Sequence, residues 1–207
     1  MSSDQFLAIA EPADALLRDR GSKFYAYAFP ATSIEDIQQK IAELQKLHPT
    51  ACHHCWASRI GWPEVEERAQ DDGEPSHSAG TPILHAIQGA GLSQSAVVVT
   101  RIFGGTKLGV PGLIASYRGA AELALAEAKT CMYTLQSEVT LTLPYEDIGA
   151  VELLTQQTQS KIRSQDFAHD VTTVIQFEMS RRGEIAKRLE NLHRISVEWS
   201  DESTFAS

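Results

Sequence analysis

The 207-residue chain lacks several features that would assign it to a familiar class of protein. Its longest apolar runs fall short of the about 18 residues that suggest a membrane-spanning helix, so no membrane span is expected. The three cysteines, Cys52, Cys55 and Cys131, do not have the number or spacing of a disulfide framework, which predicts reduced thiols. The first five residues lack the basic and apolar stretches of a secretory signal. Together these absences predict a soluble, cytoplasmic protein.

Positive charge is also scarce. The formal net charge is −9, and no basic run is longer than pairs such as Arg181-Arg182 and Lys187-Arg188. Non-specific binding to nucleic acid depends on clustered positive charge that displaces counterions. The composition therefore does not favour RNA as a partner and leaves open only contact through one local patch.

The common nucleotide-binding motifs are absent, but residues 97–112 contain a different glycine-rich pattern. Neither the P-loop spacing nor the dinucleotide spacing of glycines occurs. Instead, the β-branched residues 97–100 predict a buried strand, followed by a loop with Gly104 and Gly105 and then an Ala/Leu-rich helix. Arg101 and Lys107 bracket the turn, and free N–H groups at the helix start would add to their positive field. The loop would suit a phosphate, a carboxylate or an acidic loop of the same protein; alternatively, it is a tight connection whose charges pair with the chain's own carboxylates.

The segment from Asp71 to Gly80 concentrates reactive groups in a turn. Asp71, Asp72 and Glu74 supply carboxylates, while Ser76 and His77 add a hydroxyl and an imidazole. Such carboxylates hold Mg²⁺ or act as a general acid and base in other proteins, although the spacing matches no calcium loop. In the second interpretation, Asp-Gly makes the turn, the carboxylates cap backbone N–H groups, and one of them pairs with Lys107 or Arg101.

The run Cys52-His53-His54-Cys55 contains zinc-ligand residue types in an unsuitable pattern. Successive side chains of a strand point to opposite faces, so at most two of the four could join one site. No second Cys/His pair has zinc spacing, and no activating motif supports Cys55 as a nucleophile with His77 as its base. We therefore predict no metal and no cofactor, and expect His53 or His54 to form a hydrogen bond across the sheet.

The order of expected elements predicts an α+β fold with two domains, 1–133 and 134–207. The first half has strand patterns at 23–29, 52–60, 65–69 and from 97, with helices at 34–48, 82–89 and 112–129. Thr81 is expected to cap the second of these helices. The second half restarts with strands at 139–143, 162–169, 171–179 and 195–199 and helices at 145–161 and 180–192, the last one capped by Ser180. This βαββαβ order is that of a ferredoxin-like domain.

Specific motifs between residues 18 and 125 resemble the YigZ/IMPACT family. They include Arg20-Gly21-Ser22-Lys23-Phe24, His48-Pro49, His53-His54-Cys55, Asp71-Asp72-Gly73-Glu74-Pro75-Ser76, Phe103-Gly104-Gly105, Lys107-Leu108-Gly109, Gly112-Leu113 and Tyr117. The resemblance implies a first domain with the fold of the second domain of a small-subunit ribosomal protein. It also implies a second domain similar to domains of elongation factor G, and a role near translation without an established reaction. Eukaryotic relatives bind a ribosome-associated activator and carry an additional partner-binding domain that has no counterpart in this sequence.

Three positions depart from the family pattern. Ile102 stands where an aromatic residue is usual, Pro111 where glycine is usual, and His77 interrupts a segment that usually reads Ser-Gly-Thr. Pro111 is expected to stiffen the loop.

The sequence thus favours a non-catalytic regulatory or binding protein that contacts an RNA–protein or protein partner of the translation machinery. The alternative is a hydrolase for a phosphate- or carboxylate-bearing substrate in the same cleft, between the Asp71–Ser76 and Arg101–Gly109 loops. The candidate binding residues are His53, His54, Asp71, Asp72, Glu74, Ser76, Arg101, Gly104, Gly105 and Lys107.

Overall fold

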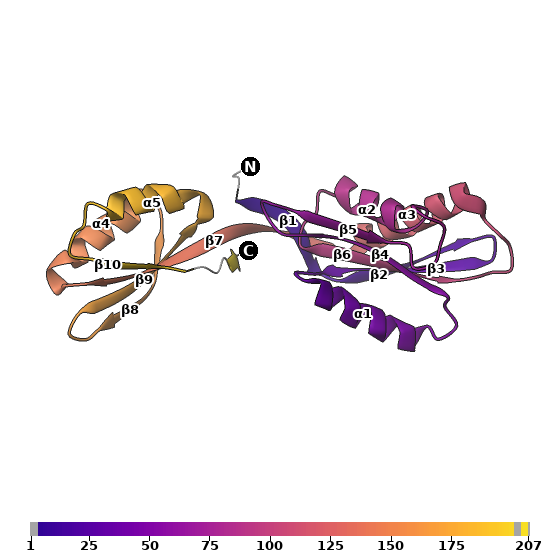
Figure 1. Ribbon diagram of the computed structural model, residues 1–207, viewed down its shortest axis with the longest axis horizontal. Coiled ribbons are helices and arrows are strands. Elements are labelled where there is room, and N and C mark those ends of the chain that lie inside the picture. The colour runs from indigo at the N-terminus through magenta and orange to yellow at the C-terminus, as the bar shows by residue number, and fades with distance from the viewer. Residues whose placement is uncertain (1–3, 201–203, 207) are drawn as a thin grey trace. The chain divides into compact units, whose positions relative to one another are not determined.

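The computed structural model describes residues 4–200 and 204–206, which divide into two compact units. The first unit is Phe6–Met132, and the second combines the described residues before Phe6 with those from Tyr133 on. Each unit combines helices with an antiparallel sheet, which confirms the α+β class (Figure 1). Residues 1–3, 201–203 and 207 of the two expected domains lie outside the described residues. None of the described helices has the length and apolar character needed to cross a membrane.

The first unit is built on a five-stranded sheet with helices on both faces (Figure 1). Its strands, in spatial order, are β2 (Ala13–Asp19), β3 (Ser22–Pro30), β6 (Ser95–Ile102), β4 (His53–Ile60) and β5 (Glu66–Gln70). One face is covered by α2 (Gly80–Gly89) and α3 (Gly109–Glu127), the other by α1 (Ile34–Leu47). The central strand β6 is buried from Ser95 to Arg101 because it is covered on both faces, and this explains its β-branched run.

Two hydrophobic clusters in this unit fix which face each site residue occupies. The cluster under α2 and α3 contains Phe24, Cys55, Val99 and Tyr117. The cluster under α1 is built around Ile37, Leu44 and Val98. Alternation along β6 and β4 therefore places Arg101, His53 and Cys55 on the α2/α3 side of the sheet.

The second unit has the ferredoxin-like element order. It contains β7 (Lys129–Leu143), a 3₁₀ turn (Tyr145–Asp147), α4 (Ile148–Thr158), β8 (Lys161–Phe167), β9 (Val171–Glu178), a second 3₁₀ turn (Met179–Arg181), α5 (Arg182–Leu189) and β10 (Ser196–Trp199). Its strands lie in the order β10, β7, β9, β8, all antiparallel, over one core that includes Val139, Ile175 and Ile185. Strand β11 (Thr204–Ala206) also pairs with β7, and so does β1 (Gln5–Glu11), which apart from Gln5 belongs to the first unit.

Several expected elements differ from the structure. Strands β1, β2 and β11 are absent from the sequence-based prediction, and β7 continues from Lys129 through the region where the sequence pattern restarts. Thr81 does not cap α2, which begins at Gly80 and takes its cap from Asp71. Ser180 does not cap α5; its N–H donates to the carboxylate of Asp4 instead.

Candidate functional site

Arg101 occupies the last inward-facing position of β6 and directs its guanidinium toward the loop that follows β5. Its Nη1 donates to Glu74 Oε1 over 2.6 Å, and the two side chains are only 8% and 4% exposed. The guanidinium also lies 5.6 Å from the ring centroids of Phe24 and of Phe103. The positive charge of Arg101 is therefore held in a fixed position by one carboxylate and two aromatic rings.

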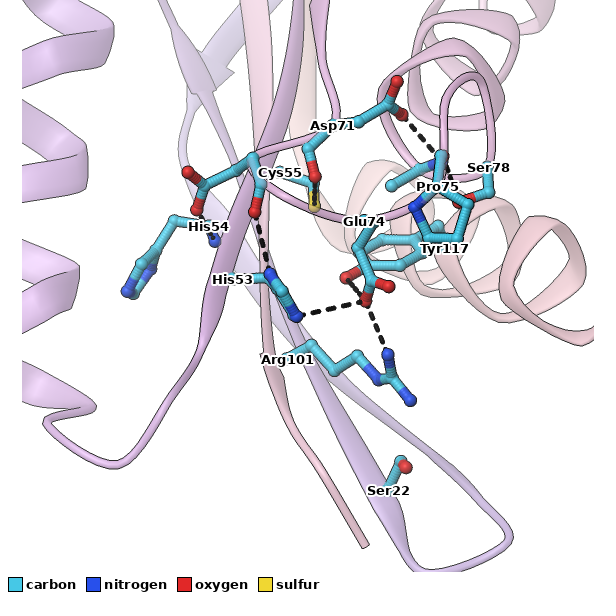
Figure 2. Close-up of polar contacts among 12 residues, drawn as sticks. Ser22, His53, His54, Cys55, Asp71, Glu74, Pro75, Ser78, Arg101 and Tyr117 are labelled. Carbon is cyan, nitrogen blue, oxygen red and sulfur yellow. Dashed lines mark hydrogen bonds and ion pairs between the residues drawn. The ribbon is translucent and has the colours of Figure 1, made fainter. Parts of the chain in front are cut away.

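Glu74 is the centre of the cluster shown in Figure 2. Besides Arg101, the hydroxyl of Tyr117 donates to its Oε1 over 2.8 Å, and His53 Nε2 lies 4.0 Å from the same atom. Burial, followed by the nearby Cys55 and Glu74, raises the pKa of Tyr117 far above its usual value, so its hydroxyl remains a donor. A single carboxylate thus links the loop to β4, β6 and α3.

Asp71 acts as a remote cap for α2. Its Oδ1 accepts hydrogen bonds from the N–H groups of Ala79 and Gly80 over 3.0 and 2.8 Å, and its Oδ2 accepts one from His77 over 2.8 Å. Burial alone would raise the pKa of Asp71, but these backbone hydrogen bonds outweigh it and lower the pKa below its usual value. The contacts agree with the second interpretation of this segment, in which the carboxylates cap backbone groups.

Asp72 fastens the same loop to the start of β4. Its Oδ2 accepts from the backbone N–H of His54 over 2.6 Å, and its carbonyl oxygen lies 2.8 Å from His53 Nδ1. A carbonyl can only accept, so His53 carries a proton on Nδ1 and presents Nε2 to Glu74.

Neither His54 nor Cys55 presents a reactive group to the site. His54 points to the opposite face of the strand (Figure 2), where a 2.9 Å hydrogen bond joins Nδ1 to Thr100 Oγ1 and burial lowers its pKa. Cys55 donates from Sγ to the carbonyl oxygen of Asp71 over 2.9 Å, and burial raises the pKa of its thiol well above the usual value. Among the described residues, no three His, Cys, Asp or Glu side chains are grouped so that they could hold a metal ion.

The glycine loop, residues 103–108 between β6 and α3, packs against the turn between β2 and β3. Gly104 N donates to Ser22 Oγ over 3.1 Å, and a Cβ built on Gly104 would lie only 1.8 Å from the carbonyl carbon of Gly21. Helix α3 then begins at Gly109 with no side-chain cap and no acidic residue in its first turn. As in every α-helix, its first N–H groups have no intrahelical partner, and no side chain of the described residues caps this positively polarised helix end.

A cleft of about 370 Å³ lies between the two loops. It is lined by Glu74, Pro75, Arg101, Phe103, Lys107, Leu108, Gly109, Val110 and Leu113. Of the expected site residues, the structure brings Glu74, Arg101 and Lys107 together here, and His53 reaches the cleft through Glu74. Asp71 and Asp72 hold the loop from behind, Ser76 is exposed within it, and Gly104 and Gly105 shape the opposite loop without lining the cleft.

Sequence reasoning missed the aromatic and apolar part of the site. Phe103 and Val110 are 50% and 45% exposed at the cleft. The sequence identifies Tyr117 only as a residue of the family motif, although a hydroxyl among the alanines and leucines of this helix signals a buried hydrogen-bond partner.

The three departures from the family pattern have simple structural settings. Pro111 lies in the first turn of α3, where its missing N–H costs no hydrogen bond, so it begins a helix and does not stiffen a free loop. His77 has φ +62°, a conformation that favours the usual glycine. Ile102 pairs with Lys23 across β3 and is partly exposed.

Comparisons with known proteins place this site within a matched region. Residues 20–125 match the Impact N-terminal domain. The chain is 28% identical over 197 residues to IMPACT family member YigZ of Escherichia coli (strain K12), covering 94% of this chain and 97% of that protein. It is 42% identical over 130 residues to "IMPACT family member in pol 5'region" of Thermus thermophilus, covering 63% and 69% of the two chains. A solved crystal structure of a hypothetical protein, 28% identical, superposes with a TM-score of 0.68 and covers 96% of this chain and 98% of that one.

Proposed function

Because this chain belongs to the IMPACT family, we propose that it is a non-catalytic binding protein of the translation machinery. It contacts an RNA–protein or protein partner through the cleft between the Asp71–Ser76 and Arg101–Gly109 loops. The link to translation is what the family resemblance implies, and the cleft supplies the surface.

The observation that carries this proposal is the attachment of both loops to one buried carboxylate. Glu74 accepts from Arg101 and from Tyr117, so the loop, β6 and α3 hold their positions without a partner. A preformed surface loses little conformational freedom on binding, and this favours affinity. The exposed Phe103 and Val110 beside the exposed Lys107 combine apolar contact area with a charge, as protein interfaces do.

The hydrolase alternative is less well supported by the same geometry. Asp71 and Asp72, the paired carboxylates that it requires, accept hydrogen bonds from backbone N–H groups. The thiol of Cys55 is buried and hydrogen-bonded. These groups stabilise the loop and do not point into the cleft.

The domain limits 1–133 and 134–207 also remain a proposal, supported by hydrophobic clusters that do not mix residues of the two units. Each fragment expressed alone is expected to unfold cooperatively, the second less stably because it loses Asp4 as acceptor for Ser180. A fragment that stays unfolded on its own would contradict the division.

The test of the binding function is co-sedimentation of the full chain with ribosomal fractions. Lys107→Glu and Phe103→Ala are expected to reduce association while the urea midpoint of unfolding changes little, because both side chains are exposed at the cleft. Lys161→Glu, a matched charge change at an exposed lysine of β8, is the control and is expected to bind like the wild type. Equal association of all four proteins, or none by the wild type, would overturn the proposal.

A further inference from the structure

Three exposed apolar side chains of the first unit lie at the cleft or directly beside it. Phe103 and Val110 line the cleft, as described above, and Ile114 is 39% exposed. Val110 and Ile114 are four residues apart in α3, so they share one face of the helix. Single exposed apolar side chains are common on protein surfaces, but a group of them marks a binding surface. The cleft and the adjoining face of α3 therefore form one apolar surface.

The charges at this cleft leave a positive excess. Its lining contains one carboxylate, that of Glu74, and two cations, Arg101 and Lys107. Glu74 is neutralised by its ion pair with Arg101. Lys107 is exposed and forms no salt bridge with any of the described residues. The first turn of α3, which lines the cleft, has no acidic residue that would offset Lys107, so an anionic group is attracted here although the chain as a whole is acidic.

Arg101 keeps one donor that its own fold does not use. Nη1 donates to Glu74, and Nε is enclosed by the protein. Nη2 is not enclosed in this way, has no hydrogen-bond partner in the described part of the chain, and points away from Glu74 in Figure 2. The ion pair and the rings of Phe24 and Phe103 hold the guanidinium in place. Lys107 and Arg101 Nη2 are thus the donors that the cleft offers to an acceptor.

We propose that the cleft binds a short acidic segment of a protein partner. A bulky apolar side chain of that segment packs against Phe103 and Val110, and a carboxylate next to it in the segment lies beside Lys107. The inference rests on the proposed function, since it names the part of the partner that is recognised.

The lining favours a peptide over a nucleic acid. Single-stranded nucleic acids are bound by positively charged grooves that follow the phosphates and by aromatic rings on which successive bases stack. This cleft has one cation without a salt bridge and one aromatic ring, and the rest of its lining is mainly aliphatic: Pro75, Leu108, Val110 and Leu113. At about 370 Å³ the cleft is near the lower end of the range for ligand sites, about 300–1,000 Å³, so it takes a few side chains and not a folded surface.

The test is fluorescence anisotropy of short labelled peptides titrated with the full chain. In the first peptide, Glu alternates with Leu and Phe. In two matched peptides, Gln or Lys replaces every Glu, and in a fourth peptide Ala replaces Leu and Phe. The wild type is expected to bind the Glu peptide more tightly than any of the other three. Its preference for Glu over Gln should decrease with rising salt, because Lys107 is exposed to solvent.

Two variants of the cleft separate charge from apolar contact. Lys107→Glu should reverse the preference, so that the Lys peptide binds more tightly than the Glu peptide, a result that partial unfolding would not produce. Phe103→Ala should weaken binding of the Glu peptide by more than about fivefold, as expected for an anchor residue, and should keep the preference for Glu. Lys46→Glu, the same charge change at an exposed lysine of α1 on the other face of the sheet, is the control and should retain the wild-type affinities. The urea midpoint of each variant verifies folding.

Other outcomes would overturn the proposal. These are no binding of the Glu peptide by the wild type, equal binding of the Glu and Lys peptides, a Lys107→Glu variant that still prefers Glu, a Phe103→Ala variant that binds like the wild type, or tighter binding of an oligouridylate than of the Glu peptide. Ribosome co-sedimentation that depends on Lys107 but is found without peptide binding would overturn this inference alone. Peptide binding as expected without ribosome association would overturn the proposed function alone.

Discussion

Arg101 and Glu74 form an ion pair that is almost completely withdrawn from solvent, with 2.6 Å between Nη1 and Oε1. The pair has a third member, since the Tyr117 hydroxyl donates to the same carboxylate oxygen. Breaking a buried pair from one side leaves an uncompensated charge, whereas removing both partners does not. The pair therefore couples the stability of the fold to the shape of the cleft.

Arg101→Met should lower the free energy of unfolding by about 3–5 kcal/mol, because Glu74 is left buried with only Tyr117 as donor. Arg101→Met combined with Glu74→Leu should cost clearly less than the sum of the two single variants. Urea denaturation of the four proteins measures this coupling. Strictly additive costs would show that the two side chains act independently.

Asp71→Asn should destabilise the protein at neutral pH by about 0.5–2 kcal/mol, the usual effect of losing a helix cap. The asparagine side chain keeps only one acceptor oxygen. When this oxygen accepts from Ala79 and Gly80, the NH2 group, which is a donor, faces the N–H of His77.

The same pair of proteins tests the pKa of Asp71. The folded-state pKa is lowered, so its contribution to stability is complete above the unfolded value of about 3.9 and is lost as pH falls through the folded value. The stability difference between wild type and Asp71→Asn should therefore be constant near pH 6–7 and shrink below about pH 4. A difference that does not change with pH would mean that Asp71 is not ionised in the fold.

How far the sequence predicts this structure depends on the kind of signal. The buried strand before the glycine loop and the apolar helix after it are predictable because their periodicity reflects burial directly. Strand β2 is missed because Leu16 and Leu17 interrupt the alternation and charged residues follow. For the site, the charges of Glu74 and Arg101 are recognisable, but a pairing across 27 residues follows from the strand register, which local patterns do not encode.

Gly104 and Gly105 should respond very differently to alanine. A Cβ at Gly104 would overlap the backbone of Gly21 and Ser22, so Gly104→Ala must separate the glycine loop from the β2–β3 turn. At Gly105 nothing lies within 4 Å, and only its φ of +88° opposes a side chain, a strain of roughly 1–2 kcal/mol. Urea midpoints should fall more for Gly104→Ala. Equal losses would mean that backbone conformation, and not close packing, determines both positions.

At position 77 the backbone conformation favours glycine, but the chain has histidine. Its φ of +62° is costly for a residue with a Cβ, while its N–H is needed by Asp71. His77→Gly and His77→Ala both keep that N–H and both remove the 3.2 Å hydrogen bond between the imidazole Nδ1 and Thr81 Oγ1. They differ only in strain and in the larger freedom of glycine in the unfolded chain, which opposes the gain by about 0.4–1 kcal/mol. The glycine variant should therefore be the more stable of the two, by up to about 1 kcal/mol. Thermal unfolding of the two variants measures this difference, and an alanine variant at least as stable as the glycine variant would show that the loop relaxes out of the left-handed conformation.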